Sequence, residues 1–211
     1  GTPSLSRQGL GSIATLMLNV AAGAFGDAAI AGMSIVTRIS FFTYAMVIGL
    51  GQGFQPLCGF CYGAKLYGRV KEAFFFCIKC GTVFLSVCAL LGFIFSTSII
   101  SIFRDDAAVV AVGSVALRWQ VLSFPLVASI VLTNMLMQTI RKPVRANIVA
   151  AARSGLFFIP LIFILPYFFG LLGVEMCQMW ADCCSFAVAV PIAWSAFRDM
   201  RREKMELGKS H

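Results

Sequence analysis

Apolar residues fill six long stretches of the chain, and most charged residues fall at the ends of those stretches. A helix that crosses a bilayer needs about 20 apolar residues, because each residue advances the helix by about 1.5 Å. Each stretch is about that long, which predicts an all-α polytopic membrane protein with six transmembrane helices. The charges that enclose the stretches are Arg7 to Asp27, Arg38 to Lys65, Lys79 to Arg104, Arg118 to Arg141, Arg153 to Glu175 and Asp182 to Arg198.

These boundaries predict the helices and the loops between them. We expect helices at about Ser6–Ala31, Met33–Tyr62, Val70–Phe103, Ala107–Ile140, Val144–Phe169 and Glu175–Phe197. Outer loops are expected at Phe25–Asp27, Phe103–Asp106 and Gly170–Gly173, and inner loops at Gly63–Gly68 and Arg141–Pro143. Residues 1–197 then form one six-helix transmembrane unit, and residues 198–211 a polar cytoplasmic tail. The chain begins with Gly1 and shows no signal-peptide pattern, so we expect that native residues precede it.

Charge distribution predicts the orientation. The chain is 59% hydrophobic, 12% charged and has a formal net charge of +8. If the helices alternate direction, one side collects the basic clusters Lys65–Lys71, Arg141–Arg145 and Arg198–Lys209. By the positive-inside rule that side is cytoplasmic, so both termini are expected in the cytoplasm. The expected location is the plasma (inner) membrane. The basic clusters are interpreted as topology signals near anionic headgroups. No aromatic-interleaved basic face accompanies them, so nucleic acid is not an expected partner.

The cysteine and histidine patterns do not favour a catalytic or metal centre. Cys58-x-x-Cys61 and Cys77-x-x-Cys80 have the spacing of a zinc ribbon, but both pairs lie inside apolar helical sequence without turn-rich knuckles. Free cysteine is a common small hydrophobe at buried positions, which is the interpretation we adopt. The single histidine, His211, lies in the tail, and no Ser or Cys has a base beside it. We expect no metal, no catalytic residues and no enzyme.

Polar residues at membrane depth are costly and therefore indicate function or helix packing. Amide pairs occur on the second and fourth expected helices, where their spacing puts each pair on one face. One interpretation is a water-filled substrate cavity; the other is interhelical packing, in which small and amide residues join membrane helices. The acid on the sixth helix has either a pairing or a cavity role. The candidate cavity-facing residues are Asn19, Gln52, Gln55, Asn134, Gln138 and Asp182.

Four segments, in order along the chain, resemble the multidrug and toxic compound extrusion (MATE) family. GLGQGFQPLCGFCYGAKLYGRVKEA, Gly49 to Ala73, is similar to the second-helix signature of a MATE lobe. GTPSLSRQGLGSIATLMLNVAAGAFGDAAIAG, Gly1 to Gly32, is similar to the family's seventh helix and the loop after it. MQTIRKP, Met137 to Pro143, resembles the loop after the tenth helix, and Arg153 to Asp182 resembles the last two helices.

The resemblance implies one lobe of a twelve-helix transporter, namely helices seven to twelve. It implies a secondary antiporter that exports organic cations and other drugs in exchange for Na⁺ or H⁺, with its cavity between two lobes. The partners would be an amino-terminal six-helix lobe, the lipid bilayer and small cationic drugs, with no cofactor beyond the coupling ion. Some members carry coupling carboxylates on helices seven and ten, but the matching regions near Ser12 and Val127 have none. Three alternatives remain: a lipid-linked oligosaccharide flippase of the same superfamily, a homodimeric half-transporter, and a non-transporting membrane module.

Overall fold

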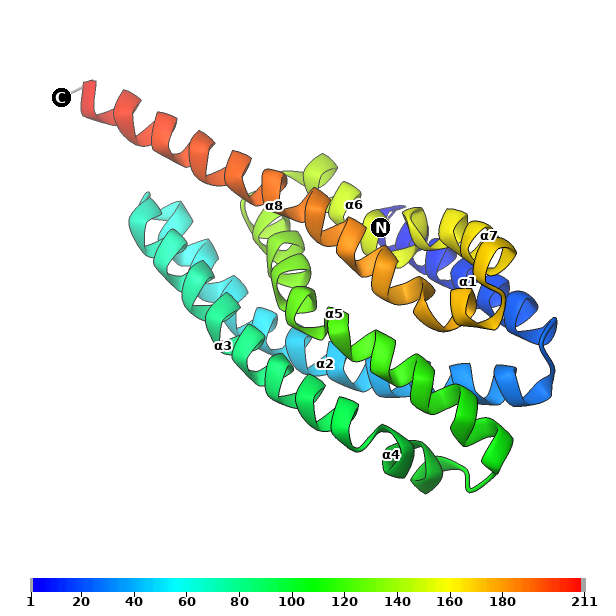
Figure 1. The fold of residues 1–211 in the computed structure, drawn as a ribbon. Helices are drawn as coiled ribbons and strands as arrows, with labels where there is room; N and C mark the ends of the chain where they lie inside the picture. Colours follow the sequence, from blue (N-terminus) through cyan, green and yellow to red (C-terminus); the bar gives the residue numbers. More distant parts are fainter. Residues whose placement is uncertain (1, 210–211) are drawn as a thin grey trace.

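The structure is a computed structural model that describes the backbone of residues 2–209 and the side chains of residues 9–153 and 155–209. Within that range the chain folds entirely into helices joined by short turns (Figure 1). The elements are α1 (Thr2–Gly23), α2 (Asp27–Gly63), α3 (Tyr67–Ile94), α4 (Ser96–Phe103), α5 (Ala107–Thr139), α6 (Pro143–Ala151), the π-helical segment η1 (Ala152–Leu156), α7 (Phe158–Phe169) and α8 (Leu171–Lys209).

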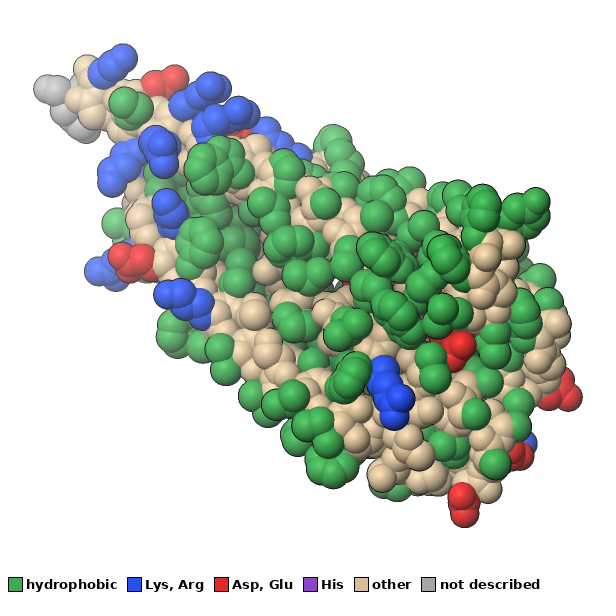
Figure 2. All heavy atoms as spheres, viewed as in Figure 1, with side chains coloured by type: hydrophobic (Ala, Val, Ile, Leu, Met, Phe, Trp, Pro, Cys, Tyr) green, Lys and Arg blue, Asp and Glu red, His purple; other side chains and the backbone are tan. Residues whose placement is uncertain are grey.

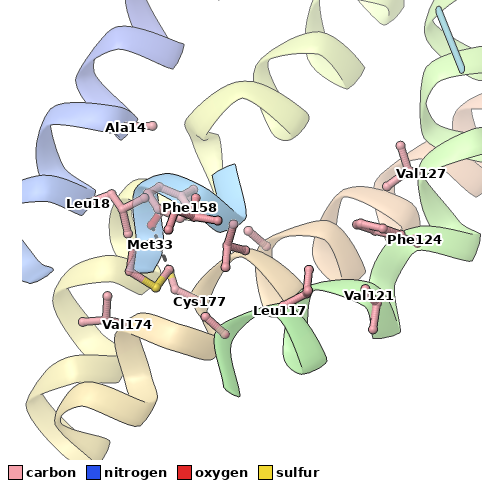
Figure 3. Packing of buried hydrophobic residues seen from close by; sticks show 14 of the residues in the cluster. Ala14, Leu18, Met33, Leu117, Val121, Phe124, Val127, Phe158, Val174 and Cys177 are labelled. Atoms are coloured by element: carbon pink, nitrogen blue, oxygen red, sulfur yellow. Dashed lines mark hydrogen bonds between the residues drawn. The ribbon is translucent and has the colours of Figure 1, made fainter. Parts of the chain in front are cut away.

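Helix α5 lies at the centre of the fold. It packs along α2, α3 and α8, which contact it more extensively than the other elements do (Figure 1). Helix α5 carries apolar side chains on several of its faces, among them the buried Leu117, Val121 and Phe124 (Figure 3). A helix that is hydrophobic all round is stable only where neighbours cover it, so this sequence favours the central position.

Helices α1 and α7 complete the lobe beside the first half of α8. Leu18 of α1, Met33 of α2, Phe158 of α7 and Val174 of α8 meet in the main apolar cluster (Figure 3). Cys177 is fully buried there, and its Sγ donates to the carbonyl oxygen of Phe158 at 3.8 Å. These contacts hold four elements together around one end of the cavity system described below.

The six expected helices are recognisable in the structure. Four helices are long and apolar enough to cross a membrane within the described residues, namely α2, α3, α5 and α8. The other two apolar helices are α1, with 22 residues, and α7, with 12 residues. Helix α5 at Ala107–Thr139 and the turn after it match the expected bounds most closely. The all-α membrane fold is therefore confirmed, although two of its apolar helices are shorter than the sequence predicted.

Several boundaries were wrong. The first helix ends at Gly23 rather than Ala31, because the chain turns through Gly26, whose φ of 106° is disfavoured for other residues. The third expected helix is two helices, α3 and α4, which meet at Phe95. At that break the fully buried Ser96 accepts a hydrogen bond from Nε of Arg118 at 2.9 Å.

The fifth and sixth expected helices also differ from the structure. The fifth is divided by η1 at Gly155, where a Cβ would lie 3.2 Å from the carbonyl oxygen of Leu10 on α1. The sixth begins at Leu171 rather than Glu175, so only Gly170, with φ 64°, remains of the expected loop. Gly173 packs so closely on the backbone of Leu165 that a Cβ would overlap it. Close approach of helices at glycine explains both differences.

The surface separates apolar from basic side chains. Figure 2 shows hydrophobic side chains over much of the molecule and Lys and Arg side chains gathered at the end that holds the C-terminus. Large apolar side chains point outward along several helices, among them Phe42, Phe60 and Tyr167, which are 72%, 73% and 83% exposed. Residues 198–209 continue α8 as a helix, and residues 210 and 211 of the expected tail lie outside the described residues. The cytoplasmic side of the tail stays a prediction.

Candidate functional site

A polar cavity of about 660 Å³ lies between α2, α5 and α6. Four of the six candidate residues line it together: Gln52 and Gln55 from α2, and Asn134 and Gln138 from α5. Arg141 and Asn147, from the turn after α5 and from α6, line it as well. Arg141 adopts φ 60°, a conformation that glycine usually takes, and its N–H closes the end of α5 on the carbonyl of Gln138 at 3.3 Å. We name this space the larger cavity, to distinguish it from the smaller cavity beside Arg153 described below.

The two amide pairs of the larger cavity differ in their hydrogen bonds. Nδ2 of Asn134 donates to the carbonyl oxygen of Ala146 on α6 at 2.7 Å, and Nε2 of Gln138 donates to Oδ1 of Asn134 at 2.8 Å. The α5 pair therefore joins two helices as well as lining the cavity. Gln52 is exposed and Gln55 half-buried, and among the described residues neither amide has a hydrogen-bond partner. The α2 pair is the more available to a ligand.

Asp182 lies next to this region in a different setting. It is fully buried on α8, and its Oδ1 pairs with Nη1 of Arg153 at 3.1 Å. Three further donors reach the carboxylate: Nε2 of Gln178 at 2.9 Å, Oγ of Ser123 at 2.9 Å and Nε2 of Gln120 at 3.4 Å. The carboxylate is therefore enclosed by polar groups from η1, α5 and α8.

A smaller cavity of about 170 Å³ lies beside Arg153. It is lined by residues from α1, α2, α5, η1, α7 and α8, including Leu18, Met33, Phe158 and Val174 of the apolar cluster (Figure 3). Its polar lining comes from Thr37, Ser40, Tyr44, Gln120, Arg153 and Gln178. The guanidinium carbon of Arg153 stands 5.3 Å from the centre of the Tyr44 ring, within the range of a cation–π contact.

A third cavity, of about 20 Å³, shares lining residues with both of the others. It is lined by Tyr44 and Asn134, which also line the larger cavity, and by Arg153, which lines the smaller one. Tyr44 thus borders all three spaces. Because they share lining residues, the three cavities lie next to one another, in a row past Tyr44.

The remaining candidates lie outside this row. Asn19 is exposed on α1 and lines none of the three cavities. The Asp182 carboxylate is enclosed by its donors, so the structure places it in the pairing arrangement. Sequence reasoning missed Arg153, Tyr44 and Gln120. The available signal was that each is a polar residue within an apolar segment. Arg153 was used only to mark the start of the fifth apolar stretch.

The cysteines do not gather into a centre. Cys58, Cys61 and Cys77 are buried in an apolar cluster between α2, α3 and the far end of α8, and Cys80 is exposed. Within residues 2–209, no three His, Cys, Asp or Glu side chains come close enough to hold a metal ion. The cysteines fit the role of small apolar side chains.

Comparison with known proteins places this geometry in a family. A model of the MatE family matches residues 3–164. The multidrug export protein MepA of Staphylococcus saprophyticus is 26% identical over 208 residues, which cover 98% of this chain and 46% of that protein. MepA of Staphylococcus aureus (strain N315) is 29% identical over 195 residues, covering 92% of this chain and 43% of that protein. The chain therefore spans less than half the length of these curated relatives.

Solved structures agree on the fold. The MATE transporter VcmN of Vibrio cholerae, in its bent form, has a TM-score of 0.87 to this chain at 19% identity, over 94% of this chain and 45% of VcmN. A MOP superfamily transporter from Pyrococcus furiosus has a TM-score of 0.88 at 18% identity, over 95% of this chain and 46% of that one. With the family match, the fold and the exposed apolar helices in agreement, the chain is an integral membrane protein that belongs to the MatE family of multidrug and toxic compound extrusion transporters.

Proposed function

We propose that the chain is the carboxy-terminal lobe of a secondary antiporter that exports organic cations and other drugs in exchange for Na⁺ or H⁺. The observation that carries this proposal is the larger cavity, where amides from α2 and α5 meet in a membrane fold. Cavities between membrane helices that combine apolar walls with a few polar groups are typical substrate sites. The relatives' shared name, multidrug export protein, supports the same activity.

The proposal assigns the chain one of two lobes. It spans 46% of the length of its relative from Staphylococcus saprophyticus, as one six-helix half would. The order of the segments that resemble helices seven to twelve favours the carboxy-terminal half. The partner is then an amino-terminal six-helix lobe, and alternating access comes from the two lobes rocking against each other. The exposed face of α2 at Phe41, Phe42 and Phe60 is available to that lobe or to lipid.

Coupling in this proposal rests on the partner lobe. Among the described residues, no carboxylate lines the larger cavity. Asp182 is paired with Arg153 and accepts three further hydrogen bonds, so its charge is already compensated. A coupling carboxylate must exchange its ion during each cycle, which such an arrangement opposes. The Na⁺ or H⁺ site is therefore expected on the amino-terminal lobe.

Transport by reconstituted protein tests the proposal. The chain alone, and the chain joined to the six-helix region that precedes it in its reading frame, are placed in proteoliposomes with a Na⁺ or H⁺ gradient. We expect gradient-driven ethidium transport only from the joined protein, because the cavity and coupling acid need both lobes. Robust transport by the chain alone would replace the proposal with the homodimeric half-transporter. No transport by the joined protein would reject it.

Substitutions in the larger cavity test its role in the joined protein. Gln52→Ala and Gln55→Ala should change drug selectivity without loss of thermal stability, because neither amide bonds another described residue. Asn134→Ala should also lower stability, since its amide holds α6. Asn19→Ala is the matched control, because Asn19 lines none of the cavities. Unchanged selectivity in the two glutamine variants would contradict a substrate role for α2.

Labelling tests the proposed orientation. On a background without native cysteines, Lys142→Cys should react with a membrane-impermeant maleimide only from the cytoplasmic side, and Asp105→Cys only from outside. Both residues lie in turns at opposite ends of α5, so one helix separates them. External labelling of Lys142→Cys would reverse the assignment of both termini.

A further inference from the structure

Two buried side-chain atoms without hydrogen-bond partners mark the smaller cavity. Among the described residues, Oγ of Ser40 and Nε of Arg153 are the buried side-chain polar atoms that have no partner. Ser40 comes from α2 and Arg153 from η1, yet both line the same 170 Å³ space. Buried donors without acceptors are costly and rare, and they are expected where a ligand or water completes the site. These two donors of the smaller cavity are therefore available to an acceptor on a ligand.

The contacts of Arg153 fix which part of its guanidinium is free. Nη1 donates to Asp182 at 3.1 Å, and the guanidinium carbon lies 5.3 Å from the centre of the Tyr44 ring. These two contacts hold the group in one orientation, while its Nε–H stays unbonded beside the cavity. Guanidinium edges bind carboxylates through parallel N–H bonds, which lysine cannot imitate. The hydroxyl of Ser40 supplies a further donor to the same space.

Charge balance selects the kind of ligand. Arg153 and Asp182 already neutralise each other, so a free anion would leave one uncompensated negative charge inside an apolar segment. A zwitterion brings its own positive charge and avoids that cost. Tyr44 lines both the larger and the smaller cavity, so the smaller cavity is adjacent to a substrate in the larger one and can receive its acidic group.

We infer that the smaller cavity binds the carboxylate of zwitterionic substrates, through Nε–H of Arg153 and the hydroxyl of Ser40. The inference rests on the proposed function and deepens it, because it assigns residues of this chain to the acidic group of a substrate. The cationic part of such a substrate then faces the larger cavity and the partner lobe. Arg153 and Ser40 become the residues that determine the preference for zwitterions over cations.

A matched pair of dyes tests this preference by binding alone. A rhodamine with a free carboxylate and its methyl ester differ only in the group that would reach Arg153. Binding of each to the purified chain in lipid nanodiscs is measured by fluorescence anisotropy. We expect the carboxylate form to bind about tenfold more tightly than the ester, as one hydrogen bond to a charged group implies. Equal binding of the two forms, or binding of neither, would overturn the inference.

Two variants separate the site from a general effect on the fold. Arg153→Lys keeps the counter-charge of Asp182 but removes Nε–H, and it should abolish the preference for the carboxylate. Ser40→Ala should reduce the preference by about threefold to tenfold. Ser195→Ala is the control, because its hydroxyl is already bonded to the carbonyl of Ile192 at 2.6 Å. A preference that persists in both Arg153→Lys and Ser40→Ala would show that the cavity holds water only.

The dye experiment and the transport experiment fail independently. Export of ethidium by the joined lobes without carboxylate-dependent binding would overturn this inference and leave the proposed function standing. Carboxylate-dependent binding to the chain without any export by the joined lobes would do the reverse.

Discussion

Two Arg–Asp pairs join the segment before α7 to α8, and they differ in burial rather than in length. Arg153 and Asp182 are 3.1 Å apart, with side chains 19% and 0% exposed. Arg145 and Asp199 are 2.9 Å apart, with side chains 32% and 26% exposed. The shorter pair lies in the more exposed position. The distance between the charged groups alone therefore says little about how much each pair contributes to stability.

The surroundings of the two carboxylates explain the difference. Asp182 receives three hydrogen bonds besides its ion pair, which replace the water it lost on burial. Asp199 keeps part of its hydration and can exchange its partner for solvent. Exposed pairs contribute little because water and salt screen them, whereas breaking a buried pair leaves a charge that nothing solvates. We call Arg153–Asp182 the inner pair and Arg145–Asp199 the outer pair. The inner pair is thus a fixed part of the fold, whereas water can replace the contact of the outer pair.

Removal of the inner carboxylate is expected to have the largest effect. Asp182→Ala should lower the free energy of unfolding by about 3–5 kcal/mol, because Arg153 is left buried without a counter-ion. Unfolding of the purified chain in mixed detergent micelles measures this. The double variant Asp182→Ala with Arg153→Met should recover most of the loss. A loss below about 1 kcal/mol in the single variant would show that water already reaches Arg153.

Loss of one supporting hydrogen bond is expected to have the next largest effect. Ser123→Ala removes a hydroxyl that lies 2.9 Å from the Asp182 carboxylate and 2.8 Å from the carbonyl oxygen of Gln120, and it should cost about 1.5–3 kcal/mol in the same unfolding measurement. Ser195→Ala provides the comparison, since its hydroxyl bonds only a backbone carbonyl within α8. If both serine variants lose equal stability, the hydroxyl of Ser123 contributes nothing specific to the carboxylate.

The outer pair should contribute much less. A double-mutant cycle with Arg145→Ala and Asp199→Ala is expected to give a coupling free energy of about 0.2–1 kcal/mol. The physical reason is that both side chains remain partly hydrated. A coupling free energy above about 2 kcal/mol would contradict the expected difference between the pairs, because the outer pair would then contribute as a buried pair does.

Salt is expected to change the contributions of the two pairs differently, and this is the smallest of the expected effects. At 1 M NaCl the screening length falls to about 3 Å, so the coupling of Arg145 with Asp199 should fall toward zero. The effect of Asp182→Ala should stay nearly constant, because ions do not enter its surroundings. Repeating both unfolding measurements at low and high salt checks this expectation. Equal salt dependence in the two pairs would contradict the assigned difference in burial.

The sequence predicted the all-α membrane fold better than it predicted where the helices begin and end. Charges between apolar stretches located six segments, since burying a charge in lipid is costly whatever the tertiary structure. The break at Phe95 and the π-helical segment around Gly155 were missed, because they depend on neighbours. Gly155 lies against Leu10, a residue 145 positions earlier in the chain. Close packing of this kind leaves no local pattern.

The candidate site was predicted in part for the same reason. Helical spacing put Gln52 with Gln55 and Asn134 with Gln138, but only packing of α2 on α5 brings the two pairs to one cavity. Asp182 was selected as a polar residue at membrane depth. Its partner Arg153 was not, because the two residues lie on different elements and only tertiary packing brings them together.

The shortness of α7 has a consequence for how the protein enters the membrane. Its 12 residues rise only about 18 Å, less than the bilayer core of about 30 Å. Arg153 before α7 and Asp182 on α8 would each cost about 2.5–3.5 kcal/mol if inserted alone. Inserted together as a hairpin closed at Gly170, with Gly173 against Leu165, the two segments bring a neutral pair into lipid. We therefore expect α7 to insert together with α8, so that changes at this turn reduce the amount of protein inserted rather than the activity of each molecule.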